Sequence, residues 1–180
     1  GPLASRGEFE VFRKLAGAGQ TVKALVAPGC ARYSRKELAA LEETAKVYGA
    51  AGLAWMKVTE GGLDGGIAKF YSTLAREVCG ELGAVPGDLI LLAGGEWKKT
   101  STALGAVRSQ LGRELKLADP KVFLFCWIID FPLFERNEAE NKWDPAHHPF
   151  TMPQEKYLAT LEQDPGAVKG DLYDLVCNGV

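Results

Sequence analysis

The chain has 180 residues, 47% of them apolar, with a formal charge of −2 and a pI near 5.8. This composition is sufficient for a hydrophobic core and excludes a disordered chain. The net charge excludes a protein that binds nucleic acid through an overall positive charge, so any contact with RNA would need a local basic patch. No stretch reaches the ~20 continuous apolar residues of a membrane span, and no basic start precedes an apolar signal core. We therefore expect a cytoplasmic protein with no membrane partner.

The two ends of the sequence are typical of a piece of a longer chain. Residues 1–5 lack a methionine, and residues 178–180 carry no signal that would end a helix. Residues 1–5 also resemble a remnant of protease cleavage, although Ala4 departs from the usual glycine. The cysteines form no Cys-x-x-Cys pair, which favours buried, reduced thiols over a disulfide framework or a zinc site. They are Cys30, Cys79, Cys126 and Cys177.

The first predicted elements are a strand and a helix. Residues 21–27 predict a strand that stops at Pro28. Ser34 and Glu37 stand three positions apart, as in the capping box of a helix, and Gly49 is placed to end that helix in the left-handed conformation. The apolar positions that recur at helical spacing are Leu38, Leu41, Ala45 and Tyr48.

The middle of the sequence repeats this alternation. A strand over 53–58 and a glycine-rich loop over 61–66 lead into a helix over 67–82. The turn at 86–88 introduces an apolar run over 89–93, which has strand length and should be buried on both faces. The helix is expected to bury Ile67, Phe70, Leu74 and Val78.

A third helix is expected to begin with Thr100 or Ser101 as its N-cap. The most apolar segment, 122–129, then predicts a central strand of a second sheet that ends at Pro132, followed by a polar excursion over 136–145. A fourth helix over about 154–161 and a last element over 171–177 complete the chain. The third helix should turn Leu104, Val107, Leu111 and Leu115 inward.

Two glycine-rich places invite an anion-binding interpretation. Residues 61–66 precede a helix but match neither the Gly-x-Gly-x-x-Gly nor the Gly-x-x-x-x-Gly-Lys-Ser/Thr spacing of phosphate-binding loops, so we favour a flexible hairpin or crossover loop. In the second place, Trp97 and the lysines at 98 and 99 could contact RNA bases and phosphates, but a solvated loop with a partly exposed tryptophan is the favoured interpretation.

The only two histidines, His147 and His148, stand side by side in the sequence His-His-Pro-Phe-Thr. Imidazole changes charge near pH 7, so such a pair suits a charged ligand. A metal site with Asp144 is not expected, because adjacent side chains on an extended chain point to opposite sides and no second cluster completes the ligands. The sequence also contains no Gly-x-Ser-x-Gly motif, the turn that presents a nucleophilic serine in hydrolases. From the residues alone, a structural role in a buried hydrogen-bond network is the default.

Three segments resemble the bacterial-type aspartyl-tRNA synthetases, a class II family, in order and spacing. They are Trp-Ile-Ile-Asp-Phe-Pro-Leu-Phe-Glu at 127–135, the histidine segment at 147–151, and Tyr-Asp-Leu-Val-x-Asn-Gly at 173–179. Ala146 stands where that family usually has methionine. The Asp-Phe-Pro and His-His-Pro-Phe-Thr segments are specific for the synthetase.

Upstream segments resemble the insertion domain of the same family, the GAD domain. They lie at 48–58, 66–70 and 102–108. This domain type also occurs in an archaeal glutamyl-tRNA amidotransferase subunit, so a non-catalytic, tRNA-contacting module of that kind stays open as the alternative.

The resemblance implies an α+β fold in three parts. Residues 1–17 would be a connector from the catalytic domain, residues 18–118 a two-layer sandwich of helices on a largely antiparallel sheet, and residues 119–180 a fragment of the antiparallel class II catalytic domain. Strands that alternate with helices would also permit a parallel sheet.

The resemblance also implies a reaction, in which ATP activates aspartate and the aspartyl group passes to tRNA. His147 would bind L-aspartate, His148 would support it, and Pro149 and Phe150 would stiffen the loop. The other motifs of the family fall outside 1–180, so no catalytic, cofactor-binding or metal residue is assigned here and the fragment alone is expected to be inactive. The parent enzyme would use ATP and Mg²⁺, bind tRNA and form a homodimer. Whether asparagine tRNA is also charged is left open.

Overall fold

The chain consists of two compact units, Gly1–Ala118 and Asp119–Val180. The computed structural model describes residues 6–119, 121–148 and 150–178. We refer to the two parts as the first unit and the second unit.

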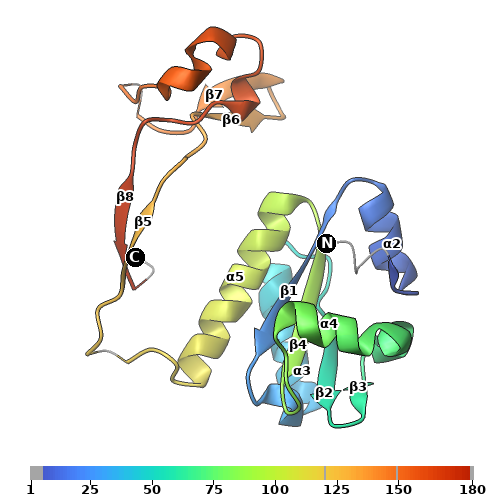
Figure 1. The fold of residues 1–180 in the computed structure, drawn as a ribbon. Helices are drawn as coiled ribbons and strands as arrows, with labels where there is room; N and C mark the ends of the chain where they lie inside the picture. Colours follow the sequence, from blue (N-terminus) through green and yellow to red (C-terminus); the bar gives the residue numbers. More distant parts are fainter. Residues whose placement is uncertain (1–5, 120, 149, 179–180) are drawn as a thin grey trace. The chain divides into compact units, whose positions relative to one another are not determined.

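The first unit contains a four-stranded sheet in the order β1-β4-β2-β3, in which every neighbouring pair is antiparallel (Figure 1). The largely antiparallel sheet expected from the sequence is confirmed, and a parallel arrangement is excluded. The strands are β1 (Thr21–Ala27), β2 (Ala54–Thr59), β3 (Gly62–Asp64) and β4 (Leu89–Gly95).

Helices cover both faces of this sheet, so the expectation of a two-layer sandwich is wrong. Helices α3 (Arg35–Val47) and α5 (Trp97–Glu114) pack on one face, and α2 (Glu10–Gly17) with α4 (Ala75–Leu82) pack on the other. The cause lies in β4, whose apolar side chains point alternately to the two faces. Leu89, Leu91 and Ala93 enter one core, and Ile90 and Leu92 enter the other. The expected burial of residues 89–93 on both faces is confirmed.

Helix α3 begins as its capping box predicts. The Ser34 hydroxyl accepts a hydrogen bond from the backbone N–H of Glu37 at 3.3 Å, and the Glu37 carboxylate accepts one from the backbone N–H of Ser34 at 2.7 Å. Hydrogen bonding from the Ser34 side chain lowers the pKa of Glu37 below its ordinary value. Gly49 follows with φ of +96°. Tyr48, expected to face inward, is the C-cap residue and is exposed, because the buried face ends with Ala45.

Two helices differ from the sequence expectation. The segment over 67–82 divides into a 3₁₀ helix, η2 (Ala68–Leu74), and the α-helix α4, and strand β3 occupies part of the loop before it. Helix α5 begins at Trp97, earlier than expected. Its N-cap is Glu96, whose carboxylate accepts a hydrogen bond from the backbone N–H of Lys98 at 2.8 Å. A glutamate side chain therefore supplies the capping oxygen that we had expected from Thr100 or Ser101.

Helix α2 lies within residues 1–17, the segment expected to be a connector, and contributes to the core of the first unit. Phe12 of α2 is buried, and its ring meets that of Phe9 edge to face with centroids 4.9 Å apart. Phe9 in turn packs against Phe70 of η2 at 5.4 Å. Helix α2 is thus part of the layer that covers the second face of the sheet.

The buried carboxylate of Asp88 links two turns at one end of the sheet, where β1 ends and β4 begins. The 3₁₀ helix η1 (Cys30–Arg32) follows β1. Asp88, directly before β4, is buried and accepts hydrogen bonds from the backbone N–H groups of Gly29 and Val85, both at 3.0 Å. One side chain thus fixes the two turns that precede η1 and β4.

The second unit is built from two separate strand pairs. Strand β5 (Phe125–Ile128) pairs with β8 (Asp174–Cys177) as an antiparallel ribbon, and β6 (Phe134–Asn137) pairs with β7 (Lys142–Pro145) as a hairpin (Figure 1). The expected polar excursion over 136–145 is therefore part of this hairpin. The expected fourth helix is a 3₁₀ turn, η3 (Glu155–Thr160), which precedes a second one, η4 (Pro165–Ala167).

The β5–β8 ribbon is exposed on both faces, which differs from the central strand expected over 122–129. Phe125 and Trp127 are more than 60% exposed, and Leu175 of β8 is 54% exposed. All four residues of β5 are exposed, although the Trp127 ring meets the Tyr173 ring edge to face with centroids 5.3 Å apart. Among the described residues, β5 has a single strand neighbour. The buried apolar residues of the described part of the unit are Leu133 and Val168.

Candidate functional site

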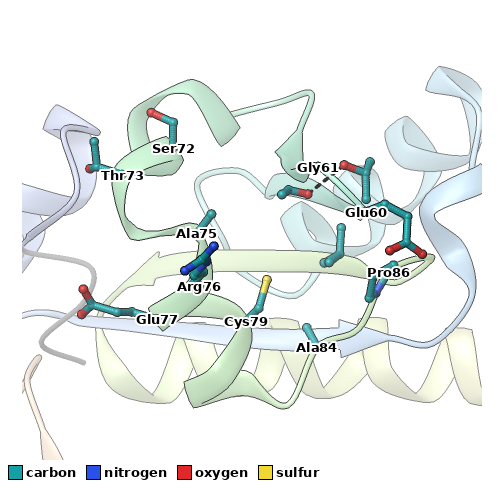
Figure 2. A pocket seen from close by; sticks show the side chains of 13 residues that line it. Glu60, Gly61, Ser72, Thr73, Ala75, Arg76, Glu77, Cys79, Ala84 and Pro86 are labelled. Carbon is teal, nitrogen blue, oxygen red and sulfur yellow. Dashed lines mark hydrogen bonds between the residues drawn. The ribbon is translucent and has the colours of Figure 1, made fainter.

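A cavity of about 670 Å³ lies beside α4 in the first unit (Figure 2). Its polar side chains come from two parts of the unit, the end of β2 with the turn after it and the segment formed by η2 and α4. They are Thr59, Glu60, Ser72, Thr73, Arg76 and Glu77. The Ser72 hydroxyl donates to a backbone oxygen of its own turn at 3.4 Å. Cys79 also lines the cavity. Burial raises the pKa of its thiol, and a thiol with a raised pKa is a poor nucleophile. The cavity has room for a ligand but no convergent catalytic groups.

A second cavity of about 560 Å³ lies between α2 and the sheet. Its lining is almost entirely apolar, with Phe12, Leu15 and Trp55 among the contributors. Gly94 leaves room for this packing: a Cβ at its position would lie 2.6 Å from the Leu15 Cδ1 atom, so the Leu15 side chain would have to shift. This cavity offers shape but no polar chemistry.

The glycine-rich loop over 61–66 packs against β2. A Cβ on Gly66 would lie 1.9 Å from the backbone oxygen of Trp55, and the N–H of Ile67 donates to that same oxygen at 3.1 Å. The close approach of two backbones explains the glycine. The N–H of Ile67 is thus directed to the protein itself, and the pairing of Thr59 with Gly62 makes the first part of this loop the β2–β3 hairpin, one of the two expected forms.

The second glycine-rich place carries an exposed tryptophan. Trp97 is 64% exposed, and the Lys23 ammonium lies 4.3 Å from the centre of its ring. Lys23 also donates a hydrogen bond to the Ser101 hydroxyl at 2.6 Å. The partial exposure expected for this residue is confirmed.

All four cysteines are free thiols. Cys30 is buried as expected, whereas Cys79 and Cys177 are only partly buried. Cys126, expected to be buried, is exposed because it lies on the uncovered ribbon strand β5.

The histidine pair follows directly from the β6–β7 hairpin. The backbone N–H of Ala146 donates to the Leu133 oxygen at 2.9 Å, which extends the hairpin pairing one residue beyond β7. The segment that carries His147 is therefore held beside residues 131–133. The His147 ring meets the Phe131 ring edge to face, with centroids 5.0 Å apart and an interplanar angle of 78°.

The two histidines have different surroundings. His147 is partly buried against Phe131, whereas His148 is exposed and its ring lies 4.8 Å from that of Phe150. The backbone N–H of Thr151 donates to the His148 oxygen at 2.9 Å and closes the turn. From the residues alone we expect the pair to lie in a buried hydrogen-bond network. Neither imidazole is fully buried, so the structure differs from that expectation. Pro149, expected to stiffen this loop, lies outside the described residues.

The acidic residue nearest in sequence is committed to the hairpin. The Asp144 carboxylate accepts a hydrogen bond from the Asn137 amide at 2.8 Å and lies 3.4 Å from the Lys142 ammonium. These contacts, the amide first, lower the pKa of Asp144. Within residues 6–119, 121–148 and 150–178, no group of three or more histidine, cysteine or acidic side chains could hold a metal ion.

Sequence reasoning missed the contacts that surround Phe131. Asp130 has φ of +59°, and its carboxylate accepts a hydrogen bond from the Gln154 amide nitrogen at 2.8 Å. The Phe131 backbone oxygen accepts from the N–H of Gly170 at 2.8 Å. No local sequence pattern indicates a contact between residues 130 and 154, so only the folded structure reveals it.

No helix in the described ranges of the chain is both long enough and apolar enough to cross a membrane.

Comparison with known proteins assigns the first unit. Curated relatives include an aspartate–tRNA(Asp/Asn) ligase of Treponema denticola, 58% identical over an alignment of 180 residues that covers 98% of this chain and 30% of the relative. The aspartate–tRNA(Asp/Asn) ligase of Treponema pallidum is 53% identical over 175 residues, covering 96% of this chain and 29% of that relative. An aspartate–tRNA ligase of Macrococcus caseolyticus is 45% identical over 179 residues, 98% of this chain and 30% of the relative.

The chain thus spans about 30% of the length of these relatives. The family model described as the GAD domain matches residues 12–104, just over half of the chain. The match runs from α2 into α5 and so includes the whole four-stranded sheet. The chain therefore belongs to the GAD domain family.

Proposed function

We propose that the chain is part of an aspartate–tRNA ligase, an enzyme that activates aspartate with ATP and transfers it to tRNA. The observation that carries this proposal is the 58% identity to a ligase of that name over 98% of this chain, which includes both units. The GAD domain alone does not separate a ligase from an amidotransferase-type module. The match of the second unit, which lies outside the GAD domain, favours the ligase.

We further propose that the second unit belongs to the antiparallel sheet of a class II catalytic domain. A two-stranded ribbon is marginally stable in water, and the exposed side chains of β5 and β8 need a cover. Among the described residues, β5 and β8 form a sheet with each other alone, so each strand has an outer edge to which a further strand can add. The remaining length of such a ligase would supply those strands.

His147 is the residue proposed to contact the aspartate substrate. Aspartate presents one ammonium group and two carboxylates, and a partly exposed imidazole can donate a hydrogen bond to a carboxylate. The Phe131 ring limits the orientations of this imidazole. His148 supports His147 from the neighbouring position, where its backbone oxygen accepts the hydrogen bond that closes the turn.

The remaining parts of the reaction are assigned to the parent enzyme. ATP and Mg²⁺ would bind there, and tRNA would be its second substrate; positioning and electrostatic stabilisation would supply most of the catalysis. No catalytic, cofactor-binding or metal residue is proposed within this chain. A homodimeric, cytoplasmic parent enzyme completes the proposal.

The test uses aspartate-dependent exchange of pyrophosphate into ATP by the full-length protein. We expect exchange in the full-length protein and none in the 180-residue chain. His147→Ala in the full-length protein should lower kcat/KM for aspartate by about 5- to 150-fold, the loss of about 1–3 kcal/mol of polar contact, with the KM for ATP little changed. Thermal unfolding of the same variant serves as the control. A destabilised variant with an unchanged KM for aspartate would return His147 to a purely structural role.

A further inference from the structure

The backbone at Asp130 has an unusual conformation. Its φ of +59° lies in the left-handed region, which is unfavourable for a residue with a Cβ and persists only when neighbouring contacts impose it. Asparagine and aspartate tolerate this region better than most residues, because their short side chains form local hydrogen bonds. Asp130 immediately precedes Phe131, so this conformation sets the direction in which the next residue leaves.

Gln154 holds Asp130 in this conformation. Its amide nitrogen donates to the Asp130 carboxylate at 2.8 Å and to the Gly170 backbone oxygen at 3.3 Å. The backbone N–H of Gln154 donates to the Lys169 oxygen at 2.9 Å, so its own position is fixed by the backbone. One amide side chain thus connects three segments that are distant in sequence.

Phe131 connects Asp130, its neighbour in sequence, with His147. Its backbone oxygen accepts from Gly170 at 2.8 Å, and its ring meets the His147 ring at 5.0 Å. The hairpin holds the His147 segment from the other side through the Ala146 to Leu133 hydrogen bond. The imidazole is therefore oriented by a ring whose backbone depends on the left-handed residue beside it.

We propose that Gln154 and Asp130 are positioning residues for His147 and that the Phe131 ring is the surface against which they orient its imidazole. This inference rests on the proposed function, because it names residues that determine how His147 meets aspartate. Gln154 touches neither the imidazole nor, in this proposal, the substrate. It acts through the backbone conformation at Asp130.

The test compares replacements at Asp130 in the full-length protein, with pyrophosphate exchange as the assay. Asp130→Ala loses the carboxylate and disfavours the left-handed backbone, and should raise the KM for aspartate by about 3- to 10-fold, the range of one net hydrogen bond. Asp130→Gly also loses the carboxylate but adopts positive φ freely, and should stay near wild type. Equal effects of the two replacements on the KM for aspartate would overturn the inference.

Replacement of Gln154 gives an independent test. Gln154→Ala should raise the KM for aspartate over the same range while the KM for ATP stays unchanged, and this penalty should shrink in the Asp130→Gly background. Gln163→Ala, at an exposed glutamine of the same unit, is the matched control. Fully additive effects would contradict a shared mechanism.

The aromatic contact is tested by a conservative pair. Phe131→Tyr keeps the ring and should retain the wild-type KM for aspartate, whereas Phe131→Leu should raise it. If wild type is active and His147→Ala raises the KM for aspartate while Gln154→Ala does not, this inference fails and the proposed function stands. If the full-length protein shows no aspartate-dependent exchange, both fail.

Discussion

Two apolar strands have opposite surroundings in this chain. Leu89–Gly95, strand β4, is buried on both faces and paired on both edges, whereas β5 is exposed on both faces and paired on one edge. Strand β4 has its cover within the same unit, from helices on each side of the sheet. An apolar run therefore predicts that a strand must be buried, but it does not say whether the cover lies in the same piece of chain.

The largest expected effect comes from separating the two units. Residues 6–118 alone should unfold cooperatively, because both cores of the first unit lie within them. Residues 119–180 alone should show no cooperative transition and should aggregate through the β5–β8 ribbon. Thermal unfolding by circular dichroism, with analytical ultracentrifugation, measures both. A cooperative transition in residues 119–180 would mean that the ribbon needs no further strands.

The same comparison can be made with one chemical change at two leucines. Leu91→Ala should lower the free energy of unfolding of the first unit by about 2–5 kcal/mol, because it removes fully buried methyl groups. Leu175→Ala, on the exposed ribbon, should change the stability of the chain by less than about 0.5 kcal/mol. Urea unfolding of the 180-residue chain gives both values. Similar losses at the two positions would show that the ribbon is covered.

A smaller effect is expected at the buried carboxylate of the first unit. Asp88→Ala removes the acceptor of two backbone N–H groups and should cost about 1–2 kcal/mol of stability. Asp88→Asn keeps one acceptor oxygen and should cost less. Asp144→Ala is the comparison in the second unit, where the half-buried carboxylate accepts one hydrogen bond, from a side-chain amide, and its loss should cost less than that of Asp88. An Asp88→Ala chain as stable as wild type would contradict the linking role.

The smallest effect concerns the start of α3. Ser34→Ala should cost about 1 kcal/mol and return the pKa of Glu37 toward its ordinary value, because the Ser34 hydroxyl is the main cause of its lowering. A lowered pKa means that the contribution of Glu37 to stability is present above the ordinary glutamate range and is lost as the pH falls through the lowered value. Titration of Glu37 by NMR in both proteins checks the shift. An identical pKa in the variant would exclude the Ser34 hydroxyl as the main cause of the lowering.

Local signals in the sequence were sufficient for much of the first unit. Strand β1, the capping box of α3 and the apolar run of β4 each depend on neighbouring residues, and all three are as expected. The start of α5 was misplaced because Glu96, a less common N-cap, supplies the oxygen. The layer count was wrong although β4 already indicated burial on both faces, which a two-layer sandwich cannot provide.

The candidate site was predictable only in part. The adjacent histidines identify the segment, but the contact of His147 with Phe131 depends on the pairing of the β6–β7 hairpin. That pairing is set by a turn that the sequence presents only as a polar excursion. The hydrogen bond from Gln154 to Asp130 depends on the folded unit as a whole and has no local signature.

The most direct test of the account is amide hydrogen exchange in β4 and β5, measured both in the 180-residue chain and in the full-length protein. We predict that β4 is strongly protected in both, and that Phe125–Ile128 exchanges rapidly in the 180-residue chain but slowly in the full-length protein, where further strands pair with it. Strong protection of β5 in the 180-residue chain, or rapid exchange of β5 in the full-length protein, would contradict the claim that the first unit is complete by itself and the second is completed by the rest of a ligase.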